Sequence, residues 1–175
     1  MVIDCFYIPA DGYFCGGSTN EVIKEGDTIR FTGAHFNNSY TDVNVTYFAN
    51  YARFHAELIP KEIFEKFKNL EGFDLEKVGL PKLTKNSFDH CKNLVEISLR
   101  GNRIKEIPAE GFAKCESLVE LDLRENDIKI ISKSGFIGLG KLEKLFMREN
   151  SIDEILDDIF TPLISLTEID LQKLS

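Results

Sequence analysis

The sequence predicts an α/β solenoid, in which a stack of similar units forms one parallel β-sheet behind a small N-terminal β cap. Three observations predict this fold. Apolar residues recur every 24 residues, each unit opens with an alternating strand-like segment, and an asparagine follows that segment at a fixed distance. The chain has 175 residues, 43% hydrophobic and 29% charged, which is ordinary for one folded domain with a continuous core.

The repeat is clearest in the second half of the chain. At Leu94 the sequence reads LVEISLRGNRIKEI, at Leu118 it reads LVELDLRENDIKII, and at Leu142 it reads LEKLFMRENSIDEI. A similar unit starts earlier, at Leu70, and another begins at Leu166. We divide the chain into a cap at 1–45 and repeats at 46–69 (irregular), 70–93, 94–117, 118–141, 142–165 and 166–175 (incomplete).

Each unit contains a strand, a turn and a convex segment. The segment x-L-x-L-x alternates with period two, which predicts a strand with its leucines inward. An asparagine suits the turn after it, because its amide can bond backbone groups that no strand partner reaches. We expect a buried ladder of amides and, on the convex side, a spine of aromatic rings. The amides are Asn102, Asn126 and Asn150, and the rings are Phe88, Phe112, Phe136 and Phe160.

The pattern weakens at both ends of the chain. Phe54, Val78 and Leu174 stand where the ladder requires asparagine, so we expect the first units to be irregular. The last unit stops soon after its strand, and no closing cap covers its apolar end. We therefore expect a truncated chain.

Two cysteines occupy an apolar repeat position. Cys91 and Cys115 stand where later units have Leu139 and Leu163, so we expect two buried thiols that act as small hydrophobic residues. Adjacent strands lie about 4.8 Å apart, so a bridge between these cysteines is geometrically allowed but not required.

The 24-residue grid with its phenylalanine spine resembles the extracellular leucine-rich-repeat family. That resemblance implies a horseshoe with the parallel sheet on its concave face and a small disulfide-bonded β cap, which the non-repeating residues 1–45 would form. It also implies a bridge between Cys5 and Cys15. The alternative is two unpaired thiols in a cytosolic protein, where disulfides are rare. The Cys-x9-Cys spacing lacks the paired cysteines of a zinc site, so we expect no metal.

The N-terminal half is also similar to secreted insect leucine-rich-repeat proteins. The similarity rests on the two-cysteine cap and on the segments that begin at Ala52-Arg-Phe, Leu58-Ile-Pro and Phe64-Glu-Lys-Phe. The mosquito immune members of this group associate with complement-like thioester proteins. They carry more repeats and a C-terminal coiled coil with cysteines, which are absent here. The resemblance implies a secreted, non-enzymatic protein-binding module that acts in innate immunity as a recognition or scaffold protein. A fragment of a receptor ectodomain and an intracellular repeat adaptor are the alternatives.

Several observations bear on localisation and partner class. The first residues do not form a secretory signal peptide, so we expect an extracellular protein whose leader is not in this chain. Asn37-Asn-Ser and Asn44-Val-Thr are glycosylation sequons, which favour secretion. The chain has no apolar run of about 18 residues, so we expect no membrane span. A net charge of −8 and a pI near 5.0 disfavour nucleic acid as a partner.

The sequence contains no recognisable catalytic motif. It lacks G-x-S-x-G, H-E-x-x-H, C-x-x-C and a phosphate-binding glycine loop, and its three histidines are scattered. We expect neither an enzyme nor a cofactor.

Outward-facing strand positions are the candidate partner surface. With the first leucine of a unit as position one, three columns of side chains point outward. Position three reads Gly72, Glu96, Glu120, Lys144 and Glu168; position five reads Asp74, Ser98, Asp122, Phe146 and Asp170; position seven reads Glu76, Arg100, Arg124, Arg148 and Gln172.

These columns allow two interpretations. In one, acidic and basic side chains neutralise each other on a solvated face. In the other, the three arginines donate to carboxylates of a partner, and Phe146 is an apolar anchor among charges. The contact residues would then be Arg100, Arg124, Arg148, Phe146, Glu120, Asp122 and Asp170. Such a strand face covers only about 500 Å², against roughly 800 Å² per partner in a standard interface. We therefore expect its flanks to contribute.

Overall fold

A computed structural model describes residues 2–10, 12–19, 21–35, 39–50 and 54–172. Asn37, Leu174 and the Ala52-Arg53 pair, all named above, lie outside these ranges. The described strands are β1 (Val2–Ala10), β2 (Gly12–Ser18), β3 (Val22–Ile23), β4 (Arg30–Thr32), β5 (Val45–Ala49), β6 (His55–Ala56), β7 (Gly72–Asp74), β8 (Glu96–Ser98), β9 (Glu106–Ile107), β10 (Glu120–Asp122), β11 (Ile130–Ile131), β12 (Lys144–Phe146) and β13 (Glu168–Asp170). The described helices are the 3-10 helix η1 (Asp42–Asn44) and the α-helix α1 (Lys61–Lys66).

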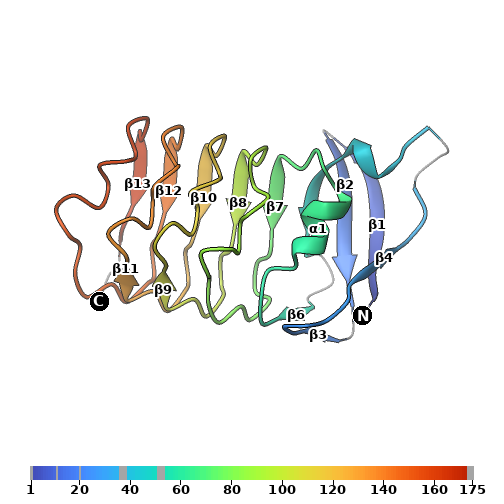
Figure 1. Cartoon of the computed structure of the whole chain (residues 1–175), viewed down its shortest axis with the longest axis horizontal. Helices are drawn as coiled ribbons and strands as arrows, with labels where there is room; N and C mark the ends of the chain where they lie inside the picture. Colours follow the sequence, from blue (N-terminus) through green and yellow to red (C-terminus); the bar gives the residue numbers. More distant parts are fainter. Residues whose placement is uncertain (1, 11, 20, 36–38, 51–53, 173–175) are drawn as a thin grey trace.

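The predicted solenoid is confirmed. A nine-stranded sheet has the order β13-β12-β10-β8-β7-β5-β2-β1-β4 and runs the length of the molecule, with the cap at one end and β13 at the other (Figure 1). From β5 to β13 neighbouring strands are parallel, and from β7 onward each residue pairs with the residue 24 positions later. This constant register places equivalent repeat positions side by side in columns.

The convex side contains little helix. Within the described residues, α1 is the one α-helix, and the convex segments of the later units are turns. Such short segments gain little from helix formation on their own, so packing against neighbouring units decides their shape. The phenylalanine spine forms as predicted, with ring centroids 5.2 Å apart for Phe88 and Phe112 and 5.9 Å apart for Phe136 and Phe160.

The asparagine ladder is also confirmed, and its geometry explains the choice of residue. Asn126 is buried, and its Oδ1 accepts a hydrogen bond from the Ile104 N–H at 3.2 Å. Its Nδ2 donates to the carbonyl oxygens of Leu99 and Leu123 at 3.0 and 3.1 Å. Equivalent contacts are made by Asn102 and Asn150. A side chain with both donors and an acceptor is needed to join two units in this way.

The early units lack this ladder, as expected. Val78 and Phe54 fill the ladder position with buried apolar side chains. Asn50 supplies a partial substitute, because its Nδ2 donates to the Glu76 carbonyl at 3.2 Å and its Oδ1 accepts from the Phe54 N–H at 3.1 Å.

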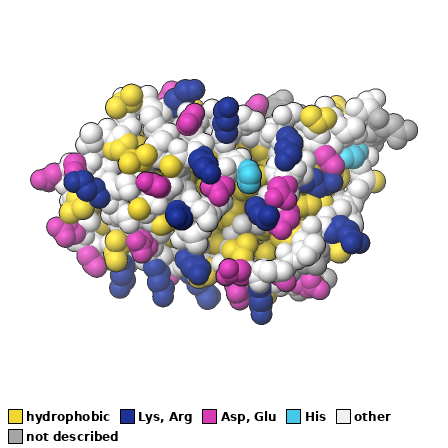
Figure 2. Space-filling view, in the orientation of Figure 1, with side chains coloured by type: hydrophobic (Ala, Val, Ile, Leu, Met, Phe, Trp, Pro, Cys, Tyr) yellow, Lys and Arg dark blue, Asp and Glu magenta, His cyan; other side chains and the backbone are white. Residues whose placement is uncertain are grey.

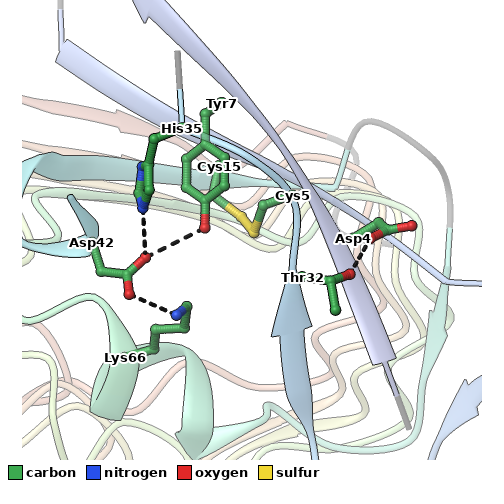
Figure 3. Close-up of a disulfide and its surroundings, with 8 residues drawn as sticks. All are labelled: Asp4, Cys5, Tyr7, Cys15, Thr32, His35, Asp42 and Lys66. Atoms are coloured by element: carbon green, nitrogen blue, oxygen red, sulfur yellow. Dashed lines mark hydrogen bonds and ion pairs between the residues drawn. A yellow bond between two sulfur atoms is a disulfide. The ribbon is translucent and has the colours of Figure 1, made fainter. Parts of the chain in front are cut away.

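The cap contains a disulfide between Cys5 and Cys15, which joins the antiparallel strands β1 and β2. A cluster around Asp42 fastens the cap to the first repeat (Figure 3). Asp42 Oδ1 accepts from the Tyr7 hydroxyl at 3.4 Å and lies 3.2 Å from His35 Nε2. Its Oδ2 lies 2.6 Å from the Nζ of Lys66 on α1. One carboxylate therefore connects β1, the cap loop and the helix.

The expectation of two unpaired thiols on the convex side was wrong. Cys91 and Cys115 form a disulfide, both are fully buried, and none of the four cysteines is free. Their Cα atoms lie 4.9 Å apart. Because equivalent positions on adjacent units are separated by about one strand spacing, they fall within the range a disulfide needs, and no backbone movement is required.

Candidate functional site

The sheet face is the candidate site. We define it by the outward side chains of the five units that contain β7, β8, β10, β12 and β13. Positions three and five of each unit lie on the strand, and position seven and the residue after it follow the strand. The register pairs Glu120 with Lys144 and places Phe146 between Asp122 and Asp170. Lys144 Nζ donates to Glu120 Oε2 at 3.1 Å, so charges on neighbouring strands do neutralise each other here.

Two of the three arginines are held by carboxylates of the chain itself. Arg124 makes a two-pronged contact with Asp122, with Nε 2.9 Å from Oδ1 and the terminal nitrogen 2.5 Å from Oδ2. Arg100 Nε donates to Glu125 Oε1 at 2.9 Å. These hydrogen bonds raise the pKa of both guanidinium groups and lower that of the Glu125 carboxyl. Neither arginine is a free donor.

Arg148 differs from the other two. Its Nε lies 3.6 Å from Glu149 Oε1, which is an ion pair but too long for a hydrogen bond. Within the described residues this Nε is shielded from solvent and has no hydrogen-bond partner. Arg148 is thus the one of the three arginines without a hydrogen bond to a carboxylate of the chain among the described residues, and its side chain is 37% exposed.

Phe146 is half-buried and is ordered by its neighbour. The guanidinium carbon of Arg124 lies 5.1 Å from the centre of the Phe146 ring, within the range of a cation–π contact. Asp122, which is 7% exposed, holds that guanidinium in place. The phenylalanine, the arginine and the aspartate therefore form one supported unit on the sheet face.

The aspartates at position five have a structural role that sequence reasoning missed. Oδ1 of Asp74 accepts from the Glu76 N–H at 2.8 Å, and Asp122 and Asp170 make the same contact with the residue two positions later. Each carboxylate thus closes the turn at the end of its strand. Burial raises the pKa of Asp74 to about 6, and the nearby carboxylates, of which Glu76 contributes most, add to this rise.

Tyr47 is a sheet-face residue that the irregular first unit concealed. Its position on β5 pairs with Gly72 on β7, and the ring occupies the space where a Cβ of Gly72 would stand. Burial and the neighbouring Glu120 raise the pKa of Glu96, and a hydrogen bond from Tyr47 partly offsets this rise. Residue 72 must be glycine for the Tyr47 ring to lie over its backbone, because a Cβ there would overlap the ring. The signal in the sequence is the single glycine in a column of charged residues.

Other kinds of site have no support in the described residues. No group of three or more His, Cys, Asp or Glu side chains there is arranged to hold a metal ion. No described helix has the length and apolar character that crossing a membrane requires.

Comparison with known proteins agrees with the fold. Residues 92–152 match the family model of the leucine rich repeat, and no curated protein matches the sequence. A chain of the LRIM1/APL1C complex has a TM-score of 0.75 and 20% identity over 98% of this chain and 30% of that chain. The APL1 leucine-rich repeat domain has a TM-score of 0.74 and 20% identity, over 98% and 42%.

A third similar structure comes from Drosophila. In the Toll–Spatzle complex the TM-score is 0.67 at 18% identity, over 84% of this chain and 20% of that chain. The present chain thus spans less than half the length of each of these three structures. At these identities the likeness establishes the leucine-rich-repeat fold.

Proposed function

We propose that this chain is a non-enzymatic extracellular recognition module that binds another protein through the sheet face and its flanks. The observation that carries the proposal is the supported unit of Phe146, Arg124 and Asp122, with Arg148 beside it. Aromatic and arginine side chains dominate the binding energy of protein interfaces. Side chains that are already ordered lose little entropy on binding, which favours affinity.

Within this proposal the predicted contact residues have different roles. Phe146 and Arg148 touch the partner directly, whereas Asp122 acts by holding Arg124. The remaining predicted contacts, Arg100, Glu120 and Asp170, form the charged rim. Because Arg100, Arg124 and Glu120 already have partners on the chain, they contribute more to the fit of the surface than to affinity.

The cysteines support an extracellular location. Both disulfides are intact in the fold, and such bonds persist in oxidising compartments and are rare in the cytosol. Asn44, in its sequon, is exposed on η1. The likeness to the LRIM1/APL1C and Toll–Spatzle structures favours a role in insect immunity, either as a secreted protein or as part of a receptor ectodomain. The two disulfides disfavour an intracellular adaptor.

A thiol count tests the extracellular part of the proposal. The protein is purified without reductant from insect cells in which the chain is secreted behind an added leader, alkylated and weighed by mass spectrometry. We expect no alkylated cysteine before reduction and four after it. Four free thiols in the unreduced protein would contradict an extracellular role.

Capture from insect haemolymph tests the binding part. Wild-type protein and the double variant Phe146→Ala with Arg148→Ala are immobilised, and captured proteins are quantified. A second double variant, Ile137→Ala with Lys133→Ala, removes one exposed apolar and one cationic side chain from the convex side as a control. We expect wild type and the control variant to capture the same haemolymph protein in similar amounts. The sheet-face variant should capture at least tenfold less of it. Equal capture by all three would place the site elsewhere.

A further inference from the structure

A second surface of the solenoid is rich in cations. We define the turn edge as the segments 77–82, 101–106 and 125–130, which follow the sheet strands and end at the first residues of β9 and β11, together with β6 of the irregular first unit. Figure 2 shows a row of Lys and Arg side chains projecting from the lower edge of the molecule, the edge that carries β6, β9 and β11 in Figure 1. Glu125 belongs to both surfaces, but none of the cations of this edge is among the proposed contact residues of the sheet face, so the inference does not depend on the proposed function.

A groove opens on this edge where the cap meets the repeats. Its volume is about 380 Å³, and three basic side chains line it, those of His55, Lys77 and Arg103. Two glycines line the groove, Gly79 and Gly101, with positive φ angles of 77° and 70°. The positive φ of Gly101 is a property of its repeat position, because Lys77 and Glu125 adopt it too, but only glycine adds no side chain to the groove there. A Cβ on Gly101 would lie 2.7 Å from Cγ of Lys77, so the lysine stem lies across this glycine.

The cations continue along the edge beyond the groove. Arg103 and Lys105 are exposed on either side of the fully buried Ile104. Lys129 lies on the next unit beside Lys105, because its N–H donates to the Lys105 carbonyl at 3.0 Å. The two ammonium groups therefore start from adjacent backbone positions about 4.8 Å apart.

These cations are not held by close carboxylates as Arg100 and Arg124 of the sheet face are. Within the described residues, Lys77, Arg103, Lys105 and Lys129 form no ion pair with a carboxylate. Carboxylates also lie nearby. Glu57 lines the groove, Glu106 accepts a hydrogen bond from Ser132, and Asp127 follows Arg103 on the next unit. Glu125 is already paired with Arg100, and Asp153 lies beside Lys129, because its N–H donates to the Lys129 carbonyl at 3.4 Å. Lys105 and Lys129 lie side by side on neighbouring units and repel each other, which favours an anion that covers both.

We propose that the turn edge binds a sulfated polysaccharide. The groove takes one sulfate between Lys77 and Arg103, and the rest of the chain runs over Lys105 and Lys129. A linear polymer with a charge on most of its sugars matches cations that repeat along a straight edge. The chain carries a net charge of −8, so attraction to a polyanion depends on this local row rather than on the overall field.

Binding of a heparin-derived oligosaccharide tests the proposal by calorimetry at physiological salt. The test variant carries Arg103→Ala, Lys105→Ala and Lys129→Ala. A matched control carries Lys85→Ala, Lys92→Ala and Lys141→Ala, which removes three exposed cations from other surfaces with the same change in net charge. We expect the test variant to bind at least tenfold more weakly and the control to change less than twofold. Near-wild-type circular dichroism and melting temperature establish that both variants are folded.

Three results would overturn the proposal. They are equal loss in the test and control variants, no measurable binding of wild type to the oligosaccharide, and equally tight binding of wild type to poly-glutamate or to phosphatidylserine vesicles. The double variant Phe146→Ala with Arg148→Ala is measured in parallel and should bind the oligosaccharide as wild type does. This comparison separates failure of the polysaccharide site from failure of the sheet-face site.

Discussion

Replacing Asn126 by alanine should destabilise the solenoid by an amount that the hydrogen bonds of the ladder determine. The residue stands in the middle of the ladder and is 7% exposed. Its loss leaves the N–H of Ile104 without an acceptor, in a residue that is fully buried. The three carbonyls that it also contacts each keep another hydrogen bond. Leu99 O keeps one from Asn102, and Leu123 O keeps one from Asn150. Arg124 O keeps one from the Gly101 N–H.

The expected cost follows from this inventory. One orphaned buried N–H costs about 1–3 kcal/mol, and the weakened carbonyl contacts add about 1 kcal/mol. We therefore expect Asn126→Ala to lower the free energy of unfolding by about 3 kcal/mol. Asn86→Ala is the control, since Asn86 is exposed and such substitutions stay within about 0.5 kcal/mol.

Urea unfolding followed by circular dichroism, without reductant, measures both variants. The midpoint and slope are compared with wild type, so that a loss of cooperativity is distinguished from a loss of stability. A change for Asn126→Ala of less than 1 kcal/mol would refute the reasoning, because it would mean that water or neighbouring amides replace the missing side chain.

Three further outcomes follow from the structure. Replacing both Cys91 and Cys115 by alanine should lower the unfolding free energy by about 3 kcal/mol, because the bridge spans a sequence separation of 24; an unchanged urea midpoint would contradict this. Burial first, then neighbouring carboxylates, raises the folded-state pKa of Asp74 to about 6, above its unfolded value near 3.9, so the folded state binds the proton more tightly. The stabilisation from the protonated Asp74 is complete below about pH 4 and is lost as the pH rises through 6. Asp74→Asn should reduce this loss of unfolding free energy by about 1 kcal/mol after solvent screening. Parallel stability curves for wild type and Asp74→Asn from pH 4 to 7 would refute the assignment. In the secretory pathway Asn44 should carry a glycan that Thr46→Ala removes, so an unchanged mass of that variant would exclude the site.

The repeat made most of the fold predictable. A period of 24 residues determines the register of a parallel sheet, so the column of Glu120 and Lys144 and the amide ladder both followed from spacing. The Cys91–Cys115 bridge did not follow, because a buried thiol and a bridged cysteine satisfy the same apolar position equally well.

The contacts within the cap and the arginine–carboxylate pairs could not be predicted from the sequence, for different reasons. The contacts of Asp42 join residues far apart in a segment that does not repeat, so no periodicity locates them. The repeat spacing correctly predicted that the arginines share one column of the sheet face. It could not predict which carboxylate each arginine pairs with, because that depends on the side-chain rotamer. Arg124 takes Asp122 from its own strand, whereas Arg100 takes Glu125 from the next unit.

Hydroxyl-radical footprinting of the chain with its captured haemolymph partner tests the sheet-face site most directly. The oxidation rate of Phe146 is measured by mass spectrometry with and without the partner, and exposed Ile137 on the convex side is the internal reference. We predict that binding slows oxidation of Phe146 at least threefold and leaves Ile137 unchanged. Protection of Ile137 with an unprotected Phe146 would show that the partner binds the convex side, and the sheet-face proposal would be wrong.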